Sequence, residues 1–172
     1  MTPWLSEAFE DLDLTEIRGD LHEPRIISMF AVVGHSWVKD DETAWCGAAV
    51  GAWLIAAGIH LDQIPKAERL SARGYLKLGR SCPGPLYGAI GVKRRVGGTP
   101  SQGHVGLVVA ANQATIWMIG GNQSDSVKVA PFKRSEFLGY RWPWPYDAYP
   151  MPSSSKDLPT LWKGSAAPSR ED

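Results

Sequence analysis

The chain has 172 residues, 44% hydrophobic and 21% charged, which is enough for one ordinary hydrophobic core and too little for a second full domain. Its 18 Lys and Arg residues balance 18 Asp and Glu residues, so no positive excess favours a nucleic-acid partner. No apolar run approaches the roughly 18 residues of a membrane span. The N-terminus lacks the basic and apolar regions of a signal peptide, so we expect synthesis in the cytoplasm without a secretion signal.

Apolar residues at helical spacing predict two helices in the first part of the chain. The first covers residues 4–12, where apolar and acidic residues take opposite faces, and we expect it at the surface. The second begins at Pro24, a favourable first helical residue, and runs through Val33 to a stop at Gly34. We expect this second helix to be mostly buried.

A third helix is predicted over residues 44–57. Asp40, Asp41 and Thr43 offer oxygen atoms that would cap its N-terminus, and Gly58 would end it. Glycine and alanine recur along this helix, although each glycine costs helix stability. Because so little side-chain bulk remains, we expect the helix to approach a sheet closely.

The second half of the chain is predicted to be mainly strands. One more amphipathic segment, at residues 66–78, precedes a turn-rich stretch. Short β-rich runs then suggest an antiparallel meander, with strands at residues 89–94, 104–109, 116–119 and 126–129. Helices followed by strands predict an α+β fold.

From Arg141 the sequence is rich in proline and aromatic residues. We therefore divide the chain into a domain at residues 1–140 and, at 141–172, an extended strap followed by a mobile tail. Its aromatic side chains would either stack on sugar rings or pack onto the core, and we favour packing. These side chains are Trp142, Trp144, Tyr146 and Tyr149.

Three polar residues point to nucleophilic catalysis. Cys46 lies near the start of the third predicted helix, where the helix dipole favours a thiolate. His104 has glycine close on either side, which would let another backbone approach it. Asn122 follows later and would fix the tautomer of an imidazole. Each residue alone also has an ordinary structural explanation, as a buried thiol, a satisfied histidine or a turn residue.

The expected hairpin register links the histidine to the asparagine. If residues 112–114 form the loop, Ala111 faces Thr115 and paired residue numbers sum to 226. His104 then stands directly opposite Asn122. A slip of one residue would place the two side chains on opposite faces of the sheet.

We expect neither a metal site nor a cofactor. The histidines and the two cysteines, Cys46 and Cys82, show no zinc-binding spacing, and both thiols are expected to be reduced. The glycine-rich residues 97–103 lack the Gly-Lys-Ser/Thr ending of a phosphate-binding loop. Arg73 and Lys77 would either meet substrate carboxylates or form a solvated helix face.

Three motifs in the order Cys, His, Asn resemble those of the CHAP and NlpC-type cysteine peptidases, a superfamily of cell-wall hydrolases. They are Trp-Cys-Gly-Ala-Ala at residues 45–49, Gly-His-Val-Gly-Leu-Val at 103–108 and Ile-Gly-Gly-Asn-Gln at 119–123. The resemblance covers residues 4–138. The Pro-Trp-Leu at residues 3–5 is similar to the start of a phage- and prophage-associated branch.

The resemblance implies a papain-like fold, with the nucleophile at a helix N-terminus packed on an antiparallel sheet. It implies cleavage of an amide bond in peptidoglycan, by a stem-peptide endopeptidase or an N-acetylmuramoyl-L-alanine amidase. Carried over by position, Cys46 is the nucleophile, His104 the general base and then acid, and Asn122 the orienting residue. Trp45 and Gln123 are expected to border the substrate.

The chain departs from the family pattern at one position. Many CHAP domains have an acidic residue two positions before the asparagine, where this chain has Gly120. The implied enzyme is an endolysin or virion-associated lysin, made in the bacterial cytoplasm and acting on the wall in the periplasm. Two alternatives keep the fold: a non-catalytic structural or wall-binding module of a phage tail, with phage structural proteins as its partners, and a secreted antibacterial effector.

Overall fold

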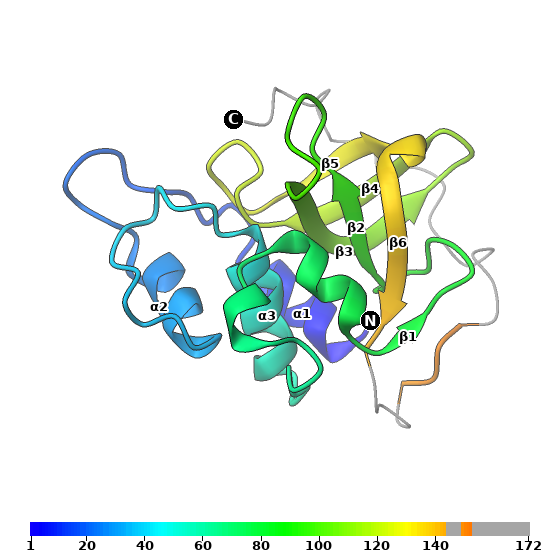
Figure 1. Ribbon diagram of the computed structural model, residues 1–172, viewed down its shortest axis with the longest axis horizontal. Coiled ribbons are helices and arrows are strands. Elements are labelled where there is room, and N and C mark those ends of the chain that lie inside the picture. The colour runs from blue at the N-terminus through cyan, green and yellow to red at the C-terminus, as the bar shows by residue number, and fades with distance from the viewer. Residues whose placement is uncertain (144–148, 153–172) are drawn as a thin grey trace.

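The α-helices lie in the first third of the chain and all six strands follow them, so the predicted α+β class is confirmed (Figure 1). The structure is a computed structural model that describes residues 1–143 and 149–152. No helix in these ranges is long and apolar enough to cross a membrane. The elements are α1 (Pro3–Glu10), α2 (Pro24–Val32), α3 (Cys46–Ala56), the 3-10 helices η1 (Lys66–Glu68), η2 (Ala72–Lys77) and η3 (Arg134–Glu136), and the strands β1 (Arg80–Ser81), β2 (Ile90–Arg94), β3 (Gly103–Ala111), β4 (Thr115–Gly120), β5 (Lys128–Lys133) and β6 (Phe137–Trp142).

The first two helices lie where the sequence predicted them. α1 begins at Pro3 and α2 at Pro24, and a proline in the first turn has no N–H group to leave unsatisfied. The Glu23 side chain accepts a hydrogen bond from Arg25 N and caps α2. The Arg25 guanidinium also donates two hydrogen bonds of 2.9 Å to the Asp11 carboxylate, which joins α2 to the end of α1.

The glycines of α3 face other helices rather than the sheet. A Cβ added to Gly47 would lie 2.7 Å from Leu70 O, and one added to Gly51 would lie 2.6 Å from Val33 Cγ1 of the α2 C-cap. The expected close approach to the sheet is made by Ala49, whose Cβ would lie 2.7 Å from a Cβ on Gly121 after β4. Small residues therefore let α3 pack between α2 and the sheet.

The fourth helical segment is not one continuous α-helix. This segment forms η1 and η2, which are separated by residues 69–71, and Ser71 has an extended ψ of 127°. The Tyr75 side chain is fully buried, and its hydroxyl donates to Gly47 O at 2.5 Å. This tertiary contact ties η2 to the start of α3.

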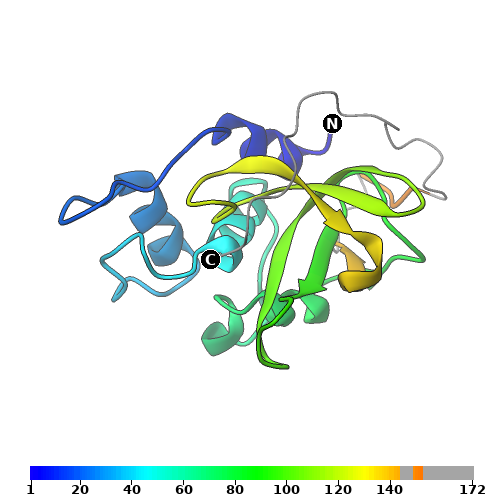
Figure 2. The same ribbon diagram turned by 90° about the horizontal axis from the view of Figure 1, so that it is seen from above.

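The sheet has six antiparallel strands in the order β1-β6-β2-β3-β4-β5. Strands β2 to β5 form the predicted meander, although β5 covers Lys128–Lys133 rather than residues 126–129. The prediction missed β1 and β6, and the expected domain boundary between residues 140 and 141 lies inside β6. Figure 2 shows the helices gathered on one side of the curved strands.

The aromatic segment begins at the end of β6, where Trp142 is buried. Trp142 is 4% exposed, and its ring meets that of Trp4 edge-on at 5.4 Å. Trp142 Nε1 donates to Tyr149 O at 3.0 Å. The favoured prediction, packing onto the core, is therefore confirmed for Trp142. Trp144 and Tyr146, like most of the expected strap and tail, lie outside the described residues.

Gly51→Ala is expected to destabilise the fold by about 2 kcal/mol, because the added methyl group overpacks a closed interface. Its Cβ would lie 2.5 Å from Tyr75 Oη and 2.6 Å from Val33 Cγ1. Urea unfolding would show a lower midpoint at an unchanged slope. Gly84→Ala is the matched control, since its Cβ would meet nothing closer than Arg134 Nη2 at 3.8 Å. Equal midpoints for the two variants would contradict the proposed packing.

Candidate active site

Cys46 is the first residue of α3 and its side chain is almost buried, at 7% exposure. The expected cap is not formed, because no side chain caps α3 within the described residues. Asp40 instead accepts hydrogen bonds from the backbone and hydroxyl of Thr43. The positive end of the α3 dipole is therefore not screened by a capping carboxylate, which favours negative charge on a group at this helix terminus.

His104 lies near the start of β3 and is 7% exposed. Its Nε2 lies 2.9 Å from Gln123 Oε1, and its ring centroid lies 5.3 Å from that of Phe132. Across the β2–β3 ladder it is paired with Lys93. The imidazole is therefore held by an amide oxygen on one side and an aromatic ring on another.

The orientation of the Gln123 amide follows from its other partners. Gln123 Nε2 donates to the carbonyl oxygens of Met118 and Lys128, and these atoms can only accept. Oε1 must then face the imidazole, and an amide oxygen can only accept as well. His104 Nε2 therefore carries the proton, and the neutral imidazole presents Nδ1 as its basic nitrogen.

Gln123, rather than the expected Asn122, is the amide that contacts His104. Strand β4 ends at Gly120, and Asn122 lies in the following turn with a φ of 55°. The predicted register is present at Leu107↔Ile119, so the pairing sum of 226 is right at that point. The predicted Ala111–Thr115 pair is wrong, because a bulge between Val108 and Ala110 pairs Ala111 with Ile116.

Gly120 lies directly beside this hydrogen bond. A Cβ at this position would lie 2.8 Å from Gln123 Oε1 and 3.3 Å from His104 Nε2. Any side chain at position 120 would displace the amide from the imidazole. Gly120, which stands where many CHAP domains have an acidic residue, thus leaves the space that the Gln123 side chain occupies.

The packing of α3 brings Cys46 to the same end of the sheet as His104. α3 contacts β3 and β4, and Gly121, next to Gly120, meets the ring of Trp45 and the side chain of Ala49. Burial raises the pKa of Tyr75, whose hydroxyl donates to Gly47 O and so lies beside the start of α3. These contacts place the start of α3 beside Gly121, one residue from Gly120, which borders the contact between His104 and Gln123.

Trp45, the residue before Cys46, is buried and held by a hydrogen bond. Its side chain is completely buried, and its Nε1 donates to Glu16 Oε1 at 2.6 Å. Burial is the largest influence on the Glu16 carboxyl and raises its pKa, against the opposing effect of the Trp45 hydrogen bond. We therefore give Trp45 and the buried Gln123 supporting roles in place of the expected substrate contacts.

The sequence did not reveal Asp41 as an organising residue. This fully buried carboxylate accepts hydrogen bonds of 2.9 Å from the backbone N–H groups of Ile17 and Glu23, and His22 Nδ1 lies 3.0 Å from it. It thereby fastens the α1–α2 connection to the segment that leads into Cys46. Burial by itself would raise the pKa of Asp41, but the hydrogen bonds outweigh burial and lower it. No local pattern distinguishes such a residue from the N-cap that was predicted.

Asp41→Asn is expected to destabilise the protein by about 2 to 3 kcal/mol near pH 7, because the amide cannot satisfy all three donors. The pKa of Asp41 is lower in the folded state, so its stabilising effect is present above the ordinary value of 3.8 and is lost as the pH falls through the folded value. Urea unfolding would therefore show a difference from wild type that narrows as the pH falls below 3.8. Asp62→Asn, at an exposed residue, is the control, and an equal loss there would refute this role.

Cys82 and the other histidines that the sequence offered as possible metal ligands do not belong to the site of Cys46, His104 and Gln123. Cys46 and Cys82 are not joined in a disulfide, and burial raises the pKa of Cys82 to about 11. Within residues 1–143 and 149–152, no three His, Cys, Asp or Glu residues gather into a possible metal site. His35 Nε2 instead lies 2.7 Å from Lys66 O, and its Nδ1 accepts a hydrogen bond from Trp37 Nε1.

Comparisons with models of protein families, with curated proteins and with solved structures give no match. The geometry of the site itself therefore carries the functional argument. It combines a cysteine at an uncapped helix start with a histidine whose tautomer is set by a buried amide. This arrangement can supply a nucleophile, a base and an orienting group.

Proposed function

We propose that this chain is a papain-like cysteine hydrolase that cleaves an amide bond of peptidoglycan. The observation that carries the proposal is the 2.9 Å contact between His104 Nε2 and Gln123 Oε1, at the sheet end against which the start of α3 packs. With Nε2 donating to Gln123, His104 Nδ1 is the nitrogen proposed to accept the proton of the Cys46 thiol. Cys46 is then the nucleophile, His104 the general base and acid, and Gln123 the positioning residue.

The proposed reaction has two steps, formation of a thioester on Cys46 and its hydrolysis by water. Cys46 gives its proton to His104 Nδ1, and Sγ attacks the amide carbonyl carbon. The C–N bond then breaks, and His104 returns the proton to the departing amine. Water next attacks the thioester and gives a proton to His104, and the acyl group leaves as a carboxylic acid while the thiol is restored. The first-turn N–H groups of α3 are the proposed donors to the oxyanion.

Peptidoglycan is the proposed substrate because the three site motifs resemble those of wall hydrolases. The residues that form the site come from all three motifs, at 45–49, 103–108 and 119–123. The same resemblance supports a phage or prophage lysin that acts on the wall either during host lysis or from the virion. The substitution of Gln123 for the family's orienting asparagine keeps the same chemical group, a carboxamide oxygen.

The test is digestion of purified peptidoglycan, with the released fragments identified by mass spectrometry. We expect fragments with new amine and carboxyl ends from the wild type and none after alkylation of the thiols with iodoacetamide. The fragment masses would name the bond. Wall binding without any fragments would contradict the enzyme and favour a wall-binding module of a phage tail.

A further inference from the structure

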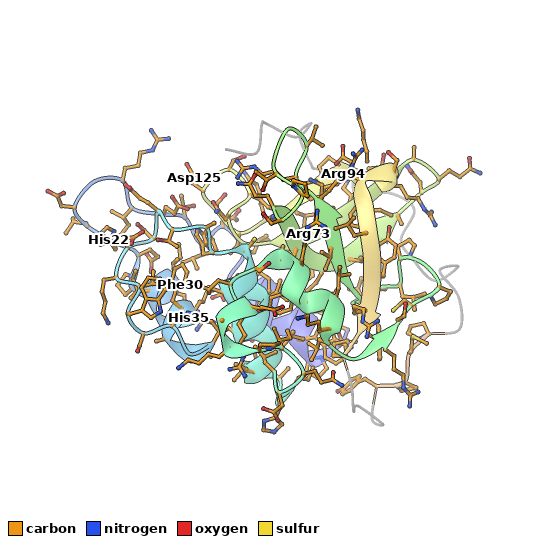
Figure 3. The ribbon with its side chains drawn as sticks, viewed as in Figure 1. His22, Phe30, His35, Arg73, Arg94 and Asp125 are labelled. Carbon is orange, nitrogen blue, oxygen red and sulfur yellow. The ribbon has the colours of Figure 1, made fainter. Side chains whose placement is uncertain are left out.

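A buried lysine lies beside His104 on the same face of the sheet. Lys93 is 1% exposed, and it is the direct partner of His104 in the β2–β3 ladder. Directly paired residues of neighbouring strands point to the same face, with their Cβ atoms about 5 Å apart. Arg94, the next residue on β2, pairs with Gly103 and points to the opposite face, where η2 carries Arg73 (Figure 3). Of these three cations, Lys93 is therefore the one that shares a face with the imidazole.

The Phe132 ring contacts both of these side chains. The imidazole centroid lies 5.3 Å from the centroid of this ring, and Lys93 Nζ lies 4.8 Å from the same point. The ammonium nitrogen and the imidazole cannot be farther apart than these two distances laid end to end. At that separation in a protein, a charge changes the pKa of its neighbour by roughly one unit. Lys93 is thus close enough to influence the protonation of His104.

Glu136 is a counter-ion of Lys93 on the side away from His104. Lys93 Nζ lies 3.5 Å from Glu136 Oε2, and the Glu136 side chain is 13% exposed. Glu136 belongs to η3, which leads into β6, and β2 lies between β6 and β3 in the sheet. Lys93 therefore comes from the strand between that element and His104. A cation next to an imidazole disfavours the imidazolium form.

Further titratable groups near His104 belong to other elements of the fold. Two of them are only half-buried, and another is the proposed proton donor. They are Lys128 of β5, which pairs with Gly120, Asp125 of the turn after β4, and the Cys46 thiol of α3. Water and salt screen partly exposed charges more strongly than buried ones. Lys93 is therefore expected to act most strongly on the imidazole.

We propose that Lys93 is a positioning residue that keeps the His104 imidazole neutral and so extends the reaction to lower pH. The inference rests on the proposed function, because it concerns the base of that reaction. Nδ1 can take the thiol proton only while the imidazole is neutral. The imidazolium that then forms is a stronger acid toward the departing amine. The acid limb of kcat/KM should follow the titration of His104.

The experiment follows the titration of His104 by NMR in the Cys46→Ala background, where no thiol is coupled to the imidazole. The signal is assigned from its loss in His104→Gln. Lys93→Met, which keeps much of the side-chain bulk, should raise the pKa of His104 by roughly one unit. Glu136→Gln removes the opposite charge and should lower this pKa. Arg94→Met is the matched control, because it removes an exposed cation of the same strand on the opposite face, and it should leave the pKa almost unchanged.

Opposite shifts in Lys93→Met and Glu136→Gln are the result expected from the proposal. Shifts of the same sign would show that the ion pair only packs the site. An unchanged titration in either variant, or an equal rise in Arg94→Met, would also overturn the proposal. Should Lys93→Met not fold, the sign of the shift in Glu136→Gln decides alone. Failure of the proposed function is distinguishable, because the wild type would then release no peptidoglycan fragments whatever the titration of His104.

Discussion

Cys46→Ala is expected to lower the release of peptidoglycan fragments by at least about 10³-fold, because it removes the only atom proposed to form the acyl intermediate. The side chain sits at the first residue of α3 with little exposed surface, so removal of one sulfur atom should leave the helix and its packing in place. Fragment release is measured by mass spectrometry at equal protein concentration. Circular dichroism and thermal unfolding of each variant verify that the fold is retained.

Cys82→Ala is the matched control for this experiment. Cys82 is also buried and outside any disulfide, but burial raises its pKa to about 11, so it is almost entirely a thiol at neutral pH. It follows β1, at the edge of the sheet, with β6 and β2 between β1 and β3. We expect the control to retain its activity. Undiminished release by Cys46→Ala would refute the proposed function.

Gln123→Ala is expected to lower kcat on the order of 10²-fold while KM changes little, because the substitution frees the imidazole that Gln123 orients. The amide oxygen fixes the proton on His104 Nε2, and the amide nitrogen is itself held by the carbonyls of Met118 and Lys128. Steady-state kinetics on a soluble wall fragment separate kcat from KM. The rate of Cys46 alkylation as a function of pH gives a second readout that a purely structural loss would not shift.

Asn122→Gly is the control that separates the two candidate amides. Asn122 has a φ of 55°, and glycine accepts this conformation without strain, so the variant removes the amide while leaving the turn intact. We expect its kcat and its alkylation profile to stay close to those of wild type. A large loss of kcat in Asn122→Gly, with little loss in Gln123→Ala, would return the orienting role to Asn122.

Much of the fold could be predicted because its signals are local. Apolar residues at helical spacing predicted α1, and Pro24, which has no N–H group to leave unpaired, marked the start of α2. Alternating β-rich runs separated by turn residues indicated the meander from β2 to β5. By contrast, β6 pairs with β2 through contacts far apart in sequence, so nothing near Phe137–Trp142 indicates its partner.

By itself, the sequence determined the α+β class, the place of Cys46 at the start of a helix and that of His104 on a strand, because residue propensity, periodicity and turn chemistry act over a few residues. Only the tertiary structure decided which amide reaches the imidazole. β4 ends at Gly120, before the predicted partner, and Asn122 lies in the following turn with a φ of 55°. The space beside Gly120 then admits Gln123, and whether such a space is filled depends on contacts that no local pattern encodes.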